Sequence, residues 1–271
     1  MLGLSYVIAA VHALSTRPGI DSSCKVNKPT LSPGKDALNG SSVLVQELAE
    51  NWGHAFIVGA ARTGKTILME QLFNQLPACV VYLKATSNAL PGWEEAPFYG
   101  TFYPADGSAP YGEDLDDVLR QRPAGRFRLD FPLAALLDST PVVAALKRGL
   151  AQSLIKSATA DHVAHLSVLV DDIEQLIGEI ALLELLSKSS CSWTLIASRQ
   201  EVKASEYQHA PYCRHVIGMQ MRGDSALVTE DTLGIPGGTL STVPYGSFWH
   251  SAQKGRPGQQ LKFYATKAHG Q

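Results

Sequence analysis

Residues 59–66 have the composition of a phosphate-binding loop. They match the pattern GxxxxGK[ST] at every defined position. In such a loop, backbone N–H groups surround a phosphate chain and the glycines allow the backbone to approach it closely. We therefore expect ATP to bind at this segment, in contact with Gly59, Ala60, Ala61, Arg62, Thr63, Gly64, Lys65 and Thr66.

Two side chains of this loop carry specific chemistry, and they require a partner elsewhere in the chain. Lys65 neutralises the β- and γ-phosphate oxygens, and Thr66 offers its hydroxyl to Mg²⁺. A second acid must hold the metal through water at the end of a neighbouring strand. The hydrophobic segment 165–171 ends in Asp171 and is followed by Asp172, and we assign Asp171 to the metal and Asp172 to the attacking water. Glu174 is the alternative base.

A later hydrophobic segment ends in three polar residues that could contact the nucleotide. Ser198 and Gln200 are candidates for contact with the γ-phosphate. Arg199 could serve its own or a neighbouring subunit's nucleotide, and Arg214 and Arg222 are further candidates for an arginine that stabilises transition-state charge in trans. A solvated strand end without such a role is the alternative.

Hydrophobic patterns predict the elements that position these residues. Apolar runs or alternation predict strands over 55–59, 78–83, 126–131, 165–171, 192–198 and 215–221. Helical patterns cover 43–51, 65–76, 113–121, 141–158 and 173–188. Strands that alternate with helices predict an α/β fold with a mainly parallel sheet covered on both faces. Short β segments are expected over 238–243 and 260–265.

Length and composition limit the domain organisation. The chain has 271 residues, of which 45% are hydrophobic and 18% charged, and this excludes disorder as the dominant state. We expect an N-terminal segment and irregular arm over 1–50, an ATPase core over 51–232, and a Gly/Pro-rich, β-like extension of the same domain over 233–271.

The formal net charge of −2 excludes a strongly basic nucleic-acid-binding chain at the level of bulk charge. The segment after Asp231 nevertheless contains no acid and carries four cations, which makes it a candidate for contact with a phosphate backbone. Residues 87–112 are rich in aromatic residues and proline but contain no Lys or Arg. That composition favours packing or subunit contact over the stacking of bases.

Other sequence features address compartment and metal binding. Four widely separated cysteines form neither a disulfide framework nor a zinc motif, which indicates a reducing compartment. His162 and His165 lack a nearby third ligand, so we expect no zinc there.

The apolar run 1–14 has no basic N-region and is too short to span a bilayer. We therefore expect a buried strand or helix there, with membrane contact as the alternative.

These features together resemble the FtsK–HerA superfamily of DNA-pumping ATPases. The resemblance rests on the loop at 59–66, the acid-ended strand before Asp172, the leucine-rich helix after it and the strand over 194–200. The compact size is most similar to genome-packaging ATPases of membrane-containing icosahedral viruses. The resemblance implies a P-loop three-layer sandwich of the additional-strand type. It also implies a Mg²⁺–ATP site at Lys65, Thr66 and Asp171 and a homo-oligomeric ring, with a hexamer as one candidate, around double-stranded DNA in the cytoplasm or a virion.

Two departures from that family keep other functions open. The family has Asp-Glu where this chain has Asp171-Asp172, and its strand-end glutamine would lie nearer Arg199 than Gln200. The same residues also resemble switch-type STAND ATPases, which act on protein partners and carry a helical lid and a winged helix after the core. The short, Gly/Pro-rich segment after Arg199 favours the DNA pump. An adaptor that binds nucleotide without turnover is the third hypothesis.

Overall fold

The structure is a computed structural model, and it describes residues 40–77, 79–86, 126–132, 165–172, 193–200, 213–252 and 258–262. The predicted helices over 113–121, 141–158 and 173–188 lie outside these residues, as do the segments 1–14 and 87–112 and the candidate base Glu174. Among the residues that are described, no helix is both long enough and apolar enough to cross a membrane.

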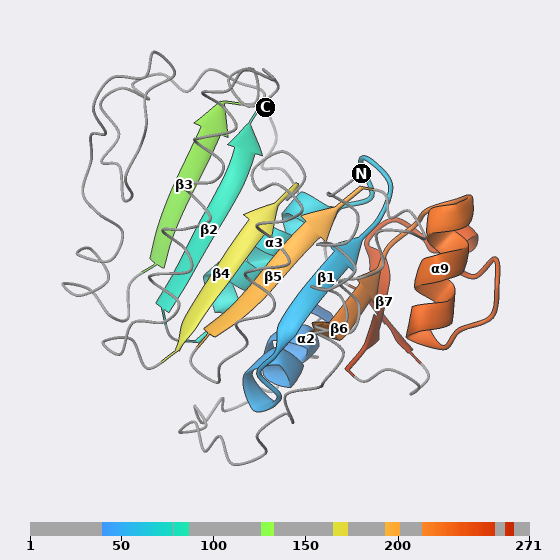
Figure 1. The fold of residues 1–271 in the computed structure, drawn as a ribbon, viewed down its shortest axis with the longest axis horizontal. Helices are drawn as coiled ribbons and strands as arrows, with labels where there is room; N and C mark the ends of the chain where they lie inside the picture. Colours follow the sequence, from blue (N-terminus) through green and yellow to red (C-terminus); the bar gives the residue numbers. More distant parts are fainter. Residues whose placement is uncertain are drawn as a thin grey trace, which may run out of the picture.

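The described residues form an eight-stranded sheet with three α-helices and one short 3₁₀-helix (Figure 1). The strands are β1 (His54–Val58), β2 (Cys79–Thr86), β3 (Arg126–Pro132), β4 (Leu166–Asp171), β5 (Trp193–Arg199), β6 (Cys213–Gly218), β7 (Ser247–Ser251) and β8 (Gln259–Lys262). The helices are α2 (Gly40–Glu50), α3 (Lys65–Gln75), α9 (Asp224–Leu233) and the 3₁₀-helix η2 (Leu240–Thr242).

The strand order is β3-β2-β4-β5-β1-β6-β7-β8. All pairs from β3 to β6 are parallel, whereas β7 and β8 are antiparallel to their neighbours. β5 therefore lies between β1, which precedes the phosphate-binding loop, and β4, which carries the two acids. This order confirms the predicted α/β fold of the additional-strand type.

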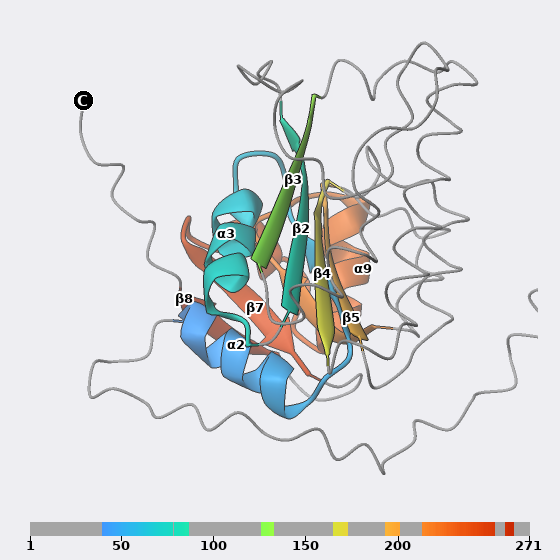
Figure 2. The ribbon, with the colours of Figure 1, turned by 90° about the vertical axis from the view of Figure 1, so that its left-hand side faces the viewer.

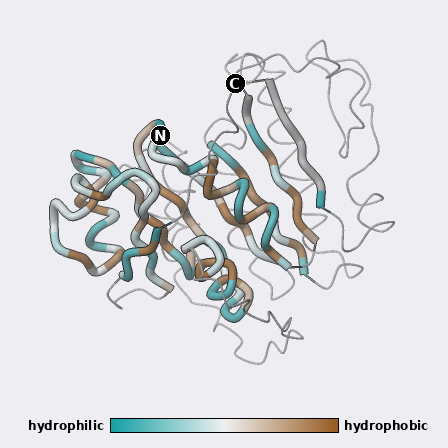
Figure 3. Tube along the Cα trace, turned by 180° about the vertical axis from the view of Figure 1, so that it is seen from behind, coloured by the Kyte–Doolittle hydropathy of each residue, from teal (hydrophilic) through white to brown (hydrophobic). Residues whose placement is uncertain are grey.

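The main hydrophobic core lies between the sheet and the helices α2 and α3, which share one face (Figure 2). Leu44 and Leu48 of α2 and Leu68 and Leu72 of α3 are fully buried there against strand residues that include Ile57. Every residue of β1, β4 and β5 is buried, because parallel strands are covered on both faces. The hydropathy colouring accordingly shows hydrophobic stretches along the central strands (Figure 3).

The end of α3 is fixed by an arginine from the far edge of the sheet. The guanidinium of Arg126, on β3, donates hydrogen bonds to the carbonyls of Phe73 and Leu76. Carbonyls at a helix C-terminus have no partner within the helix, and a cation there also interacts favourably with the helix dipole. β3 thus stabilises the helix that begins at the phosphate-binding loop.

α9 packs on the opposite face of the sheet from α2 and α3. Ile217 belongs to the core beneath α2 and α3, and successive strand residues point to opposite faces. A Cβ at the next residue, Gly218, would lie 2.8 Å from a methyl carbon of Leu233, in α9. The sequence did not reveal this helix, because its buried positions include Thr229 and Glu230 rather than a stripe of apolar residues.

The predicted β segment over 238–243 is wrong, because Leu240–Thr242 is a 3₁₀-helix. The buried carboxylate of Glu230 accepts hydrogen bonds from the N–H groups of Gly238 and Leu240, at 2.9 and 2.6 Å. These bonds satisfy the backbone locally, so the segment turns instead of joining the sheet. The strand forms later, as β7, and β8 confirms part of the predicted segment 260–265.

Two buried histidines join β7 to the parallel part of the sheet. A ring nitrogen of His215, on β6, lies 3.1 Å from one of His250, on β7, and the other lies 2.8 Å from the carbonyl oxygen of Asn51. Burial lowers the pKa of His215 to about 4 and that of His250 to about 3. Both rings are therefore neutral in the folded protein at neutral pH.

The histidine pair predicts a pH dependence of stability. The unfolded chain binds a proton at each histidine near pH 6.5, whereas the folded chain does not until about pH 4. Unfolding therefore takes up protons in this interval, and the free energy of unfolding falls as the pH decreases from 6.5 to 4. His250→Phe should reduce that slope by about one proton, measured by denaturant unfolding across the interval. Equal slopes for the two proteins would contradict the prediction.

Candidate functional site

The phosphate-binding loop lies at the carboxyl edge of the parallel strands and is fixed on both sides. The N–H of Gly59 donates to the carbonyl of Arg199, at the end of β5, at 3.2 Å. The N–H of Ala60 donates to the carbonyl of Gln220, just after β6, at 3.0 Å. The loop therefore begins in a fixed position between the two strands that flank β1.

The loop has the backbone conformation that an anion site requires. Arg62 and Gly64 have positive φ values of 63° and 103°, and Thr63 between them donates a hydrogen bond to the carbonyl of Ala60 at 2.8 Å. α3 begins directly after Gly64, and no side chain caps its N-terminus. The N–H groups of its first turn have no partner within the helix and favour a negative charge. The loop thus fits a nucleotide phosphate.

Lys65 supplies a buried positive charge inside this loop. The residue is 6% exposed, and its ammonium donates hydrogen bonds to the carbonyls of Gly59 and Ala60, at 2.7 and 3.0 Å. These contacts hold the charge among the backbone groups of the loop. An ammonium in that position can neutralise phosphate oxygens without first losing a full shell of water.

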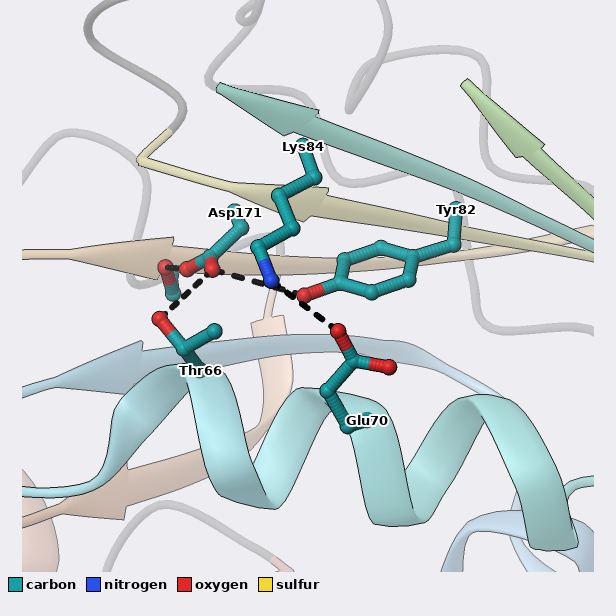
Figure 4. A network of polar contacts seen from close by, with 6 residues as sticks. Thr66, Glu70, Tyr82, Lys84 and Asp171 are labelled. Carbon is teal, nitrogen blue, oxygen red and sulfur yellow. Dashed lines mark hydrogen bonds and ion pairs between the residues drawn. The ribbon is translucent and has the colours of Figure 1, made fainter. Parts of the chain in front are cut away.

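Asp171 connects the loop to three strands through its carboxylate. One oxygen, Oδ2, accepts hydrogen bonds from the hydroxyls of Thr66 at 2.8 Å and Tyr82 at 3.4 Å (Figure 4). The other, Oδ1, accepts one from the hydroxyl of Ser198 at 2.5 Å. Hydroxyl and carboxylate oxygens are the ligands that Mg²⁺ prefers. Thr66 and Asp171, which the sequence assigned to the metal, therefore lie together and fit it.

Asp172 adopts an unusual backbone conformation, with a φ of 50°. Its N–H donates to the hydroxyl oxygen of Ser198 at 2.9 Å. Burial and the neighbouring charge of Asp171 raise the pKa of its carboxyl group, while Lys65 and a hydrogen bond with Gln200 act in the opposite direction. A carboxylate with a raised pKa next to a phosphate site has the chemical character of a general base.

β2 adds residues to the site that the sequence analysis did not single out. Lys84 pairs in register with Asp171 on β4, and its ammonium forms an ion pair with Glu70 of α3 at 3.0 Å. Tyr82, fully buried, directs its hydroxyl at Asp171. The available sequence signal for this contact was Tyr82, whose hydroxyl is a polar group within the apolar run 79–83. Its meaning depends on β2 lying beside β4, which the sequence does not reveal.

The remaining candidates are distributed along two strands. Ser198 and Arg199 are buried at the end of β5, and Gln200 is exposed directly after it. Arg222 is exposed shortly after β6, near the end that contacts the loop. Arg214 lies at the other end of β6, where its guanidinium donates to the side chain of Asn51 at 3.2 Å. The structure thus separates Arg214 from the site of its own subunit.

Comparisons with known proteins found similarity in structure but not in sequence. No protein-family model matches the chain, and no curated protein sequence does. The plasmid coupling protein TrwB, in complex with an ATP analogue, matches with a TM-score of 0.55 at 10% identity, over 90% of this chain and 92% of TrwB.

Two further solved structures match at lower TM-scores. The genome packaging NTPase B204 of Sulfolobus turreted icosahedral virus 2, bound to ATP-γS, has a TM-score of 0.44 at 14% identity, over 79% of this chain and 98% of its own. The secretion ATPase EccC of Thermomonospora curvata has a TM-score of 0.46 at 16% identity, over 81% of this chain and 26% of EccC. The match to TrwB establishes that the chain has a P-loop ATPase fold.

The close packing of Gly59 predicts that this position tolerates no side chain. A Cβ there would lie 2.7 Å from Cβ of Met219 and 2.8 Å from the hydroxyl of Thr63. Gly59→Ala should therefore displace the loop from β6, lower the free energy of unfolding by about 1–3 kcal/mol and weaken the binding of a fluorescent ATP analogue. Gly237→Ala is the matched control, because its nearest neighbour would lie 3.9 Å away. Equal stability and equal binding in both variants would show that the loop is not constrained in this way.

Proposed function

We propose that this chain hydrolyses ATP with Mg²⁺ and uses the energy to translocate double-stranded DNA as a homo-oligomeric ring. The observation that carries the catalytic part is the 2.8 Å hydrogen bond between Thr66 and Asp171. It joins the phosphate-binding loop to the acid-ended strand across the additional strand β5. In P-loop ATPases these two groups hold the magnesium ion.

Each residue of the site has a role in that reaction. Thr66 and Asp171 would hold Mg²⁺, which would supply positive charge against the charge that develops on the phosphates. Lys65 and the N–H groups at the start of α3 bind and orient the phosphates. Asp172 orients a water molecule for attack on the γ-phosphate and accepts its proton, with Glu174 as the alternative base. Because phosphoryl transfer depends mostly on positioning and charge, these fixed groups provide most of the rate enhancement.

The fold after β6 supports a pump over a switch-type ATPase. In the part of the chain that the structure describes, α9 is followed by a 3₁₀-helix and by β7 and β8, which extend the same sheet. A helical lid and a winged helix would instead place helices in this segment. Asp172, half-buried beside the buried Asp171 and close to the loop, supports hydrolysis over an adaptor role, because an adaptor needs no base.

Two observations support DNA as the substrate of the motor. TrwB, which shares the fold, is described as a plasmid coupling protein, and B204 as a DNA-packaging ATPase. The segment after Asp231 contains no acid, and Lys262 on β8 is exposed. A ring needs cations only on the surface that faces the DNA, so the net charge of −2 is compatible with this function. Such a motor would work in the cytoplasm or at a virion.

The catalytic assignment predicts that Lys65→Ala loses activity. The variant removes the buried charge of the loop, so steady-state ATP hydrolysis should fall by roughly 100-fold or more. Lys262→Ala removes one exposed charge far along the chain and should leave hydrolysis without DNA unchanged. Normal hydrolysis by Lys65→Ala, with the protein folded by circular dichroism, would refute the assignment.

The motor assignment is tested separately with DNA. We expect double-stranded DNA to stimulate ATP hydrolysis, with the stimulation decreasing as salt increases, and the active particle to have the mass of a ring, measured by light scattering. Slow hydrolysis that does not respond to DNA, in a monomer, would favour the switch hypothesis. Nucleotide binding without any turnover would favour the adaptor.

A further inference from the structure

The hydroxyl of Ser198 contacts both acids of the site at once. Ser198 is the penultimate residue of β5 and is fully buried. Its hydroxyl donates to Oδ1 of Asp171 at 2.5 Å and accepts from the N–H of Asp172 at 2.9 Å. One small side chain thus fixes the carboxylate of the first acid and the backbone of the second.

This arrangement leaves Ser198 unable to act as a sensor of the γ-phosphate. A serine hydroxyl has one proton to donate, and here that proton is donated to Asp171. The oxygen atoms of ATP phosphates are hydrogen-bond acceptors, so a contact with the γ-phosphate would require the same proton. The bond to Asp171 is also assisted by the charge of the carboxylate, which makes it costly to break.

The second contact explains how Asp172 keeps its backbone conformation. A non-glycine residue at a φ of 50° is strained and persists only when its surroundings fix it. Ser198 provides such a contact by accepting the N–H of Asp172. Because the backbone of Asp172 determines where its side chain begins, Ser198 also influences where this carboxylate can reach.

We propose that Ser198 is a positioning residue that holds the metal acid Asp171 and the base Asp172 in one fixed arrangement. This inference rests on the proposed function, because it concerns the same magnesium and ATP site. It assigns Ser198 to the metal side of the site and leaves Gln200 and Arg199 as the candidates for contact with the γ-phosphate.

The two roles of Ser198 differ in whether they depend on the γ-phosphate. A positioning residue supports the metal with ADP and with ATP alike, whereas a γ-phosphate sensor matters only when that phosphate is present. The experiment therefore measures the binding of Mn²⁺, as a probe for the Mg²⁺ site, by electron paramagnetic resonance. It compares the full chain with ADP and with a non-hydrolysable ATP analogue.

For Ser198→Ala we expect the dissociation constant of Mn²⁺ to rise about tenfold with both nucleotides, the usual effect of losing a group that orients a metal ligand. Ser198→Cys, which also lacks a strong donor, should behave in the same way and replaces the alanine variant if that protein fails to fold. Ser198→Thr keeps the hydroxyl and should retain Mn²⁺ affinity. Thr194→Val removes another fully buried hydroxyl of β5, one hydrogen-bonded to His165, and is the matched control with unchanged affinity.

Three results would overturn the inference. A loss of Mn²⁺ affinity confined to the ATP analogue would make Ser198 a γ-phosphate sensor. Unchanged affinity with both nucleotides in the alanine and cysteine variants would show that the hydroxyl positions nothing. Failure of the unmodified chain to bind Mn²⁺ with either nucleotide would refute the proposed function itself, and the role of Ser198 with it. Normal binding by the unmodified chain separates the first two results from the third.

Discussion

The carboxylate of Asp171 is the point at which the elements of the site meet. It accepts hydroxyl hydrogen bonds from Thr66 at the start of α3, from Tyr82 on β2 and from Ser198 on β5. Asp171 is only 5% exposed, and a carboxylate in such a position is costly to bury unless it is hydrogen-bonded. These contacts are available only when β4 lies between β2 and β5 and when α3 begins directly above the sheet edge. The strand order is therefore a condition for the proposed metal site.

The rest of the fold holds the carboxyl edge of the parallel strands, where the loop and Asp171 lie, in place. The fully buried leucines of α2 and α3 fix the helix that starts at the phosphate-binding loop, and Arg126 fixes its far end. On the other side of β1, β6 contacts the loop through the residues that follow it, and the histidine pair attaches β7 to β6. Elements remote from the phosphate-binding loop thus contribute by limiting the movement of the loop relative to Asp171.

The sequence predicted the parts of this arrangement that depend on local patterns. The pattern over 59–66 located the loop, and apolar runs located the strands, because buried parallel strands carry few polar residues. The roles of Tyr82, Lys84 and Ser198 depend on which strands are neighbours and in which register, and no local pattern encodes that. The error at 238–243 has the same origin, since Glu230 bonds to backbone groups eight and ten residues later in the chain.

In the proposed function, Thr66 and Asp171 form one metal site that joins the loop to β4. A double-mutant cycle tests it most directly, with Thr66→Val, Asp171→Asn and both together, by calorimetric titration of ADP in the presence of Mg²⁺. If both side chains hold the same metal ion, the second substitution should cost little once the first is present, with a coupling free energy of about 1 kcal/mol or more. Binding free energies that add to within about 0.3 kcal/mol would show that the two side chains act independently and would contradict a shared metal site.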